Sequence, residues 1–260
     1  MTAIVLDVET TGIKPHEHRV VEICIIDSAG ETVIHTYVNP EMPIPSKVIE
    51  IHGITDDMVR DAPVFSEIAE VVASAIRSAE AVVGYNPSFD RRFLAHEFHR
   101  ASIRVRWPVL VCAKRLWDKY DPVKRRLQNA YKRFVDPVGF DGAHSALNDT
   151  RACLAVFNAQ VEEFGLKGMD WKDLDPNQVE WCGDSEHLIW RNGTVIVNFG
   201  KYKGTPLHKT EPRYWRWVSG QDFPLHIDMV ASFMFGEYEG RCISGRSEAE
   251  VLAWIEEYIA

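Results

Sequence analysis

The chain has 260 residues, a formal net charge of −9 and 46% hydrophobic residues. This length and composition suit one large or two smaller domains of an ordinary globular protein. The negative charge argues against a protein that binds nucleic acid chiefly through a basic surface, and no apolar run is long enough to cross a bilayer.

The first twelve residues, MTAIVLDVETTG, contain neither a basic segment nor a cleavage site of small residues, so we expect no signal peptide. The five cysteines are scattered and form no CxxC pair, which predicts reduced thiols. Both observations indicate a cytoplasmic protein without a membrane association.

The beginning of the chain predicts three strands. Ala3–Leu6 is a short apolar run that suits a buried strand. The β-rich runs Val20–Ile26 and Thr32–Val38 flank a turn at residues 28–30, which predicts a hairpin beside the first strand. A proline-rich loop then leads to the segment HGIT, where Thr55 can cap a short helix.

Strands and helices then alternate. Pro63 begins a helix, Ala81–Tyr85 is a buried strand, Asn86 caps a helix, and Val109–Ala113 is another strand. Further helices are expected at residues 114–120, 123–134 and 145–164. This order predicts an α/β domain with a mixed central sheet flanked by helices.

The composition changes after residue 165. Residues 165–177 are rich in Gly, Asp and Pro, and six of the eight tryptophans lie from Trp171 onward, enough for a second core. Asn192-Gly193 predicts a hairpin turn, and helices are expected at residues 212–218, 227–235 and 247–258. We therefore predict a first domain at 1–167, a linker at 168–178 and a small α+β domain at 179–260.

Residues 100–133 form a basic segment, with 11 basic and two acidic residues in an acidic chain. Such a segment is either a solvated helical surface or an electrostatic track for a polyanion. The sequence leaves both interpretations open.

Two carboxylates follow the first predicted strand and are candidates for a functional site. Asp7 and Glu9 are two residues apart, so on a strand both side chains lie on one face. They would repel each other unless a hard cation such as Mg²⁺ lay between them. The alternative is a strand end that dips into solvent.

Two further segments carry suitable groups. Asp90 opens the helix after a buried strand, at the sheet edge where open α/β sheets bind ligands. His144 and Asp149 flank a junction between a loop and a helix, and neutral imidazole can accept a proton from an attacking water. Either segment taken singly is also explained by helix capping and a surface histidine.

The motifs DVETTG at 7–12, NPSFD at 86–90 and HSALND at 144–149 resemble, in order and spacing, the three exonuclease motifs of the DEDD superfamily. A histidine five residues before the last aspartate is similar to the DEDDh (DnaQ-like) branch, which includes the proofreading ε subunit of DNA polymerase III. One departure is Tyr85-Asn86-Pro87, where many relatives have His-Asn-Ala.

The resemblance implies an RNase H-like fold and a 3′–5′ exonuclease that removes nucleotides from DNA 3′ ends, most often single-stranded. It implies two Mg²⁺ ions, replaceable by Mn²⁺, with His144 as the general base. The implied metal ligands are Asp7, Glu9, Asp90 and Asp149. The residues implied in holding the terminal nucleotide are Thr10, Thr11, Gly12, Ile13, His52, Ile54, Asn86 and Phe89.

The segments FGKYKGTPL at 199–207 and PRYWRWV at 212–218 resemble the small C-terminal domain of exodeoxyribonuclease X and its relatives. Here lysines and arginines alternate with aromatic residues, a composition that can contact nucleic acid or a partner. The aromatic residues could equally fill a small core.

Three questions stay open from the sequence. RNase T and oligoribonuclease are similar in motif order, so RNA is an alternative substrate. A non-catalytic nucleic-acid-binding module is a second alternative, and the intact acidic and histidine positions argue against it. Some relatives are dimers, which leaves both a monomer and a homodimer open.

Overall fold

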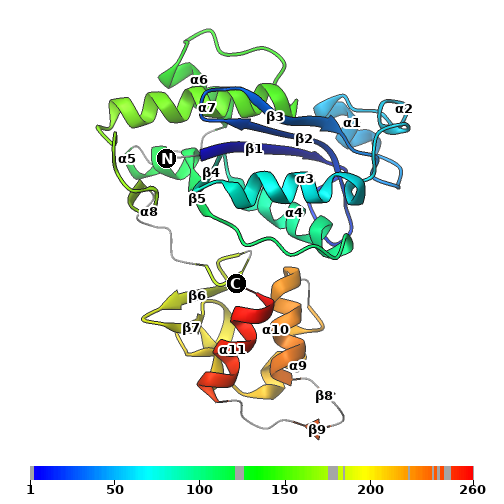
Figure 1. Ribbon diagram of the computed structural model, residues 1–260, viewed down its shortest axis with the longest axis vertical. Helices are drawn as coiled ribbons and strands as arrows, with labels where there is room; N and C mark the ends of the chain where they lie inside the picture. Colours follow the sequence, from blue (N-terminus) through cyan, green and yellow to red (C-terminus); the bar gives the residue numbers. More distant parts are fainter. Residues whose placement is uncertain are drawn as a thin grey trace. The chain divides into compact units, whose positions relative to one another are not determined.

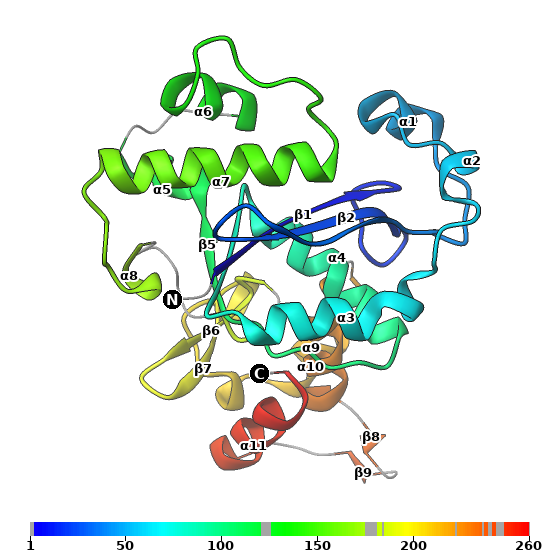
Figure 2. The ribbon, with the colours of Figure 1, turned by 45° about the horizontal axis from the view of Figure 1, so that its top comes forward.

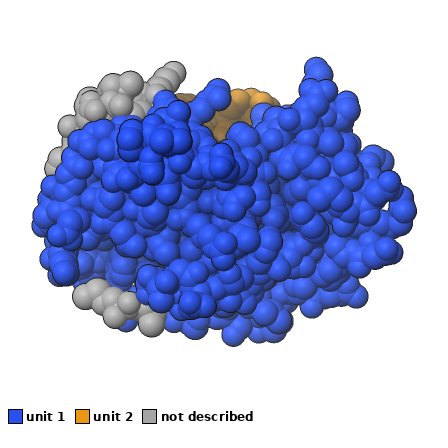
Figure 3. Space-filling model, turned by 90° about the horizontal axis from the view of Figure 1, so that it is seen from above, with its two compact units in different colours: residues 1–176 blue, residues 177–260 orange. Residues whose placement is uncertain are grey.

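The computed structural model describes residues 3–120, 126–174, 181–183, 185–221, 223–235, 237–238, 241–242 and 247–259. The chain divides into two compact units, residues 1–176 and residues 177–260, which are coloured separately in Figure 3. Each unit has hydrophobic clusters of its own.

Unit 1 is built on a five-stranded mixed sheet in the order β3-β2-β1-β4-β5. The strand β1 pairs antiparallel with β2 and parallel with β4, while β2–β3 is antiparallel and β4–β5 parallel. The predicted mixed α/β sheet is therefore confirmed. The strands are β1 (Ala3–Thr10), β2 (Val20–Asp27), β3 (Thr32–Tyr37), β4 (Ala81–Gly84) and β5 (Val109–Cys112).

Helices cover both faces of this sheet, with α3 and α4 on one side and α7 on the other (Figures 1 and 2). The period-2 alternation of β1 fills both layers. Ile4 and Leu6 pack toward α3 and α4, whereas Ala3 and Val5 pack toward α7. The helices are α1 (Ser46–His52), α2 (Asp56–Val59), α3 (Phe65–Ser78), α4 (Pro87–Arg100), α5 (Ala113–Tyr120), α6 (Leu127–Phe134), α7 (Ala146–Glu163) and α8 (Trp171–Leu174).

Some elements differ from the expectation. The strand predicted at residues 3–6 continues to Thr10, so the acidic pair lies within β1. A loop was expected before HGIT, but α1 forms there, because Pro45 stands before the helix and does not interrupt it. The short helix α8, with a buried Leu174, lies in the segment assigned to a linker. Residues 123–125 of the expected helix at 123–134 lie outside the described residues.

A buried ion pair joins the β1–β2 connection to α4. The Glu97 side chain is 1% exposed and accepts hydrogen bonds from Arg19 Nε at 2.9 Å and from the Val20 backbone N–H at 3.1 Å. Arg100 Nη1 lies 3.4 Å from the same carboxylate. A buried charge with these partners holds the two segments in one arrangement.

Part of the basic segment is ion-paired in the structure. Among its described residues, the pairs with carboxylates include Arg100 with Glu97, Lys114 with Asp118 and Arg133 with Glu163. These pairs support a solvated surface at those positions. Lys124 and Arg125 lie outside the described residues.

The described part of unit 2 combines a hairpin, β6 (Leu188–Arg191) with β7 (Thr194–Val197), and the helices that follow it. Trp215 and Val230 belong to its core. The remaining elements are η1 (Gly200–Tyr202), η2 (Leu207–Lys209), α9 (Pro212–Val218), α10 (Leu225–Phe235), β8 (Glu237–Tyr238), β9 (Arg241–Cys242) and α11 (Glu248–Tyr258). The expected small α+β fold is confirmed.

The side chains of Cys24, Cys112, Cys153 and Cys182 are buried, and none of them forms a disulfide with another described residue. Among the described helices, none combines the length and the apolar character that a bilayer crossing would need.

Candidate active site

The acidic pair of β1 lies on the sheet face that α7 covers. The alternation that sends Ala3 and Val5 toward α7 also sends Asp7 and Glu9 to that side. Glu9 is directly opposite Glu22 of β2 in the antiparallel register. Like charges opposite each other on neighbouring strands destabilise a sheet, so this position calls for a compensating cation.

The start of α7 brings two more groups to the same place. A carboxylate oxygen of Asp149 accepts a hydrogen bond from the His144 backbone N–H at 3.1 Å. His144 has a φ of 67°, a left-handed conformation that non-glycine residues rarely adopt and that is often found at functional sites.

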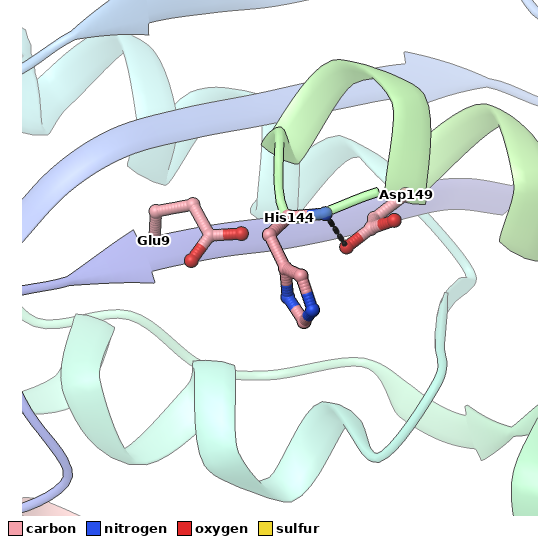
Figure 4. A group of neighbouring side chains, drawn as sticks. All are labelled: Glu9, His144 and Asp149. Carbon is pink, nitrogen blue, oxygen red and sulfur yellow. Dashed lines mark hydrogen bonds between the residues drawn. The ribbon is translucent and has the colours of Figure 1, made fainter. Parts of the chain in front are cut away.

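Three of the predicted residues converge in one group. Figure 4 shows Glu9 on β1 facing His144 and Asp149 at the beginning of α7. Their ligand atoms all lie within 4.8 Å of one another, with His144 exposed and the two acids partly buried. Carboxylate and imidazole atoms at this separation can share a metal ion.

Asp90 reaches the end of β1 from the opposite side of the sheet. The pairing of β1 with β4 ends at Val5, which leaves the later N–H groups on that edge without a strand partner. A carboxylate oxygen of Asp90 accepts the hydrogen bond of the Val8 N–H at 3.1 Å, and the residue is 4% exposed. This bond places an acid beside Asp7.

Burial raises the pKa values of all four carboxyls, and repulsion by neighbouring acids of the group adds to it at Asp7 and Glu9. Burial raises the pKa of Glu9 to about 8, with contributions from Asp149, Glu22 and Asp90. Burial likewise raises the pKa of Asp90 to about 7, against the opposing effect of the Val8 hydrogen bond. The pKa of Asp7 is well above its ordinary value for the same reasons, first burial and then the charge of Asp90.

The pKa of Asp149 is also above its ordinary value. Burial raises its pKa, while the His144 backbone hydrogen bond and the His144 ring lower it. Ionised carboxylates this close together repel one another. Such a set of oxygen donors suits a divalent cation, whose charge offsets the repulsion. The residues present therefore fit a divalent metal.

Glu22 is a residue of this site that the sequence reasoning missed. It is 2% exposed. Its carboxylate accepts a hydrogen bond from the Ala146 backbone N–H at 3.0 Å and also lies 2.8 Å from His35 Nε2. It thereby fastens the N-terminus of α7 to β2. The available signal was a single acid in the apolar run VVEICII.

The turn after Glu9 is held by its own side chains. Thr11 is fully buried, and its hydroxyl accepts a hydrogen bond from the Arg19 N–H at 3.0 Å. Thr10 donates to the Gly12 carbonyl at 2.6 Å. A Cβ at Gly12 would overlap the His18 ring, whereas Ile13 is 80% exposed and open to a ligand.

The segment HGIT supplies one candidate contact and one core residue. His52 Nδ1 accepts a hydrogen bond from the Ile54 N–H at 3.0 Å, so the neutral ring carries its proton on Nε2. That atom is buried with no hydrogen-bond partner among the described residues. Burial lowers the pKa of His52, with the nearby Thr10 backbone opposing. Ile54 is 3% exposed in a small cluster, a position that does not fit direct contact with a substrate.

The last two candidates open α4. Asn86 is exposed and has a φ of 82°, a left-handed turn that directs the chain from β4 into the helix. Its side chain makes no capping hydrogen bond, contrary to the expected cap. Phe89 is partly buried against Phe93 at a ring distance of 4.9 Å.

Comparisons with known proteins show the family of the chain. The exonuclease family model matches residues 4–157. DNA polymerase III subunit epsilon of Rickettsia prowazekii is 37% identical over 209 residues, which cover 74% of this chain and 88% of that protein. An uncharacterised exonuclease of Escherichia phage 186 is 33% identical over 60% of this chain and 86% of its own length.

A solved structure of exonuclease X with 5′-overhanging duplex DNA matches with a TM-score of 0.51 and 26% identity. The match covers 66% of this chain and 99% of that one. The mixed sheet, the helices on its two faces and the grouped carboxylates together define an RNase H-like nuclease. The chain belongs to the exonuclease family, in the DEDDh superfamily of 3′–5′ exonucleases.

Proposed function

We propose that this chain hydrolyses phosphodiester bonds at the 3′ ends of DNA in a reaction that depends on divalent metal ions. The observation that carries the proposal is the convergence of Glu9, His144 and Asp149, whose ligand atoms lie within 4.8 Å of one another although they come from distant segments. Asp7 belongs to the same group, because the charges of Asp90, Glu9 and Asp149 all raise its pKa in addition to burial. DNA is favoured as the substrate because the related proteins named above include a DNA polymerase subunit and an exonuclease bound to DNA.

In this proposal Asp7, Glu9, Asp90 and Asp149 hold two divalent ions, with Mg²⁺ as the physiological choice and Mn²⁺ as a substitute. When bound, such ions supply positive charge beside the phosphodiester and lower the pKa of water. The oxygen-rich, carboxylate-lined site favours these hard cations over softer metals.

The residues of the chain then have separate roles. The exposed imidazole of His144 accepts the proton of the attacking water, since neutral imidazole is a base near pH 7. The Asp149 carboxylate holds the His144 backbone at 3.1 Å and so positions the ring. In this proposal the His52 Nε2–H, which has no hydrogen-bond partner among the described residues, and the exposed Ile13 contact the terminal nucleotide.

A panel of end-labelled oligonucleotides, single- and double-stranded DNA and RNA of matched sequence, tests this proposal. We expect wild type with Mg²⁺ to shorten DNA from its 3′ end, to use Mn²⁺ as well and to stop in EDTA. Asp7→Asn should lose hydrolysis by at least about 10³-fold and keep its circular dichroism spectrum, since it removes charge from a repelling group.

Several outcomes would contradict the proposal. Faster hydrolysis of RNA than of DNA would reassign the substrate. Hydrolysis that EDTA leaves unchanged, or an Asp7→Asn variant as active as wild type, would reject the metal-dependent mechanism. Binding without any hydrolysis would favour a non-catalytic module.

A further inference from the structure

The aromatic residues of unit 2 fall into two groups that the sequence could not separate. Trp215 is fully buried, and its Nε1 donates a hydrogen bond to Thr210 Oγ1 at 2.6 Å. Trp217, two residues later on α9, is 53% exposed. One tryptophan therefore fills the core, while the other lies on the surface.

The exposed tryptophan continues a row of rings. The Tyr214 ring lies 5.6 Å from that of Trp217 and 4.9 Å from that of Tyr202, and both tyrosines are partly exposed. Gly200 permits this arrangement, because a Cβ there would overlap the Tyr214 hydroxyl. Helical spacing (i, i+3) keeps Tyr214 and Trp217 on one side of α9.

Positive charge accompanies the row. Lys201 Nζ lies 4.8 Å from the centre of the Tyr202 ring, and Lys203 is exposed one residue beyond that ring. Arg213 is exposed four residues before Trp217, on the same side of α9. Residues 200–219 contain five basic residues and one acid, a net +4 in a chain of −9. The acid, Glu211, lies 3.6 Å from Lys201.

We propose that Lys201, Tyr202, Lys203, Arg213, Tyr214 and Trp217 form a binding surface for single-stranded nucleic acid, called here the aromatic–basic surface. Bases stack on the exposed rings, and the lysines and the arginine meet the phosphates. The charge complementarity with a polyanion favours this occupant over a protein partner or a second copy of the chain. The inference rests on the proposed function, since it supplies a second contact for the same substrate class.

The full-length chain allows a test that does not require hydrolysis. Fluorescence anisotropy of labelled dT20 and rU20 in EDTA would give Kd at several salt concentrations. Stacking on an exposed ring predicts that Trp217→Ala weakens binding about tenfold. The double variant Lys203→Gln with Arg213→Gln should reduce the slope of log K against log salt by about 1.4, which corresponds to two lost phosphate contacts.

Arg191→Gln is the matched charge control. Arg191 is exposed beside the Asn192-Gly193 turn, whereas Gly200–Tyr202 follows the other end of the β6–β7 hairpin. This variant should leave the Kd within twofold and the salt slope unchanged. The double variant also guards against misfolding of Trp217→Ala, because Lys203 and Arg213 are both exposed and not part of the core.

Unchanged affinity and salt slope in both variants would overturn the inference. The same holds if Trp217→Ala alters only the sedimentation of the protein, which would identify a self-association surface. Hydrolysis by wild type with Mg²⁺ is measured separately. Its absence would reject the proposed function, whereas normal hydrolysis with unaltered binding by the variants would reject only the aromatic–basic surface.

Discussion

His144 is held by its backbone in a conformation that is rare for a residue other than glycine. Its left-handed φ of 67° is accompanied by the hydrogen bond to Asp149, and the ring is left exposed beside Glu9. A non-glycine residue in this conformation costs roughly 1–3 kcal/mol, which the surrounding structure must offset. The ring is thus presented to the site, but its nitrogen atoms are also close enough to the acids to bind a metal.

His144→Ala separates these two roles. If the ring is the general base, the maximal rate should fall by about 10² to 10⁴-fold at every Mg²⁺ concentration. The part of the pH–rate profile that arises from imidazole should disappear as well. Steady-state hydrolysis of labelled DNA across pH and Mg²⁺ concentration is the measurement.

Asn148→Ala is a suitable control, because this neighbour on α7 donates a hydrogen bond to the Gly142 carbonyl at 3.1 Å and is not one of the proposed site residues. A His144→Ala rate that recovers fully at high Mg²⁺ would instead make the histidine a metal ligand.

At the scale of elements, the site depends on how α7 is fastened to the sheet. Glu22 of β2 accepts the N–H of Ala146, the first residue of α7, in a buried position. The first N–H groups of a helix have no hydrogen-bond acceptor within the helix, and this carboxylate supplies one. The same contact fixes the segment that carries His144 and Asp149.

A pair of variants at Glu22 isolates this contact. Glu22→Gln keeps an acceptor oxygen and removes the charge, whereas Glu22→Ala removes both. We expect Glu22→Ala to be less stable than Glu22→Gln by about 1–3 kcal/mol, the cost of a buried N–H without a partner. Urea unfolding in EDTA at pH 7 would measure the difference, and equal stabilities of the two variants would contradict the role of Glu22.

At the scale of the whole molecule, the grouped acids make the stability of the fold depend on pH. Folding moves the pKa of Glu9 from 4.5 to about 8 and that of Asp90 from 3.8 to about 7. Between those limits the folded protein therefore binds more protons than the unfolded chain. The free energy of unfolding of the metal-free protein should fall as the pH rises through this window.

The expected slope is about −1.4 kcal/mol per pH unit for each extra proton held by the folded state. Mg²⁺ should restore stability more at pH 8 than at pH 5, because protons compete with it for the carboxylates. Urea unfolding at both pH values, with EDTA or with Mg²⁺, is the measurement. Glu9→Gln should reduce the slope of the free energy of unfolding against pH. A metal-free protein that is equally stable at pH 5 and pH 8 would contradict the raised pKa values of these acids.

Much of this protein can be predicted from the sequence, because the decisive signals are local. A spacing of two on a strand places Asp7 and Glu9 on one face whatever the rest of the fold does. The Asn192-Gly193 turn likewise predicts its hairpin, which the structure contains. The order of strands and helices along the chain was sufficient to predict the mixed sheet.

Only the tertiary structure decided what meets that face. Glu22, directly opposite Glu9 on β2, was not expected from the sequence, and the meeting of Glu9 with Asp149, 140 residues away, was implied by the motif resemblance and not by any local pattern. Likewise, Trp215 and Trp217 look equivalent in the chain, yet one is buried and the other 53% exposed. Periodicity along a strand or helix is set by backbone geometry, whereas proximity across the fold is set by packing of distant segments, which no short pattern encodes.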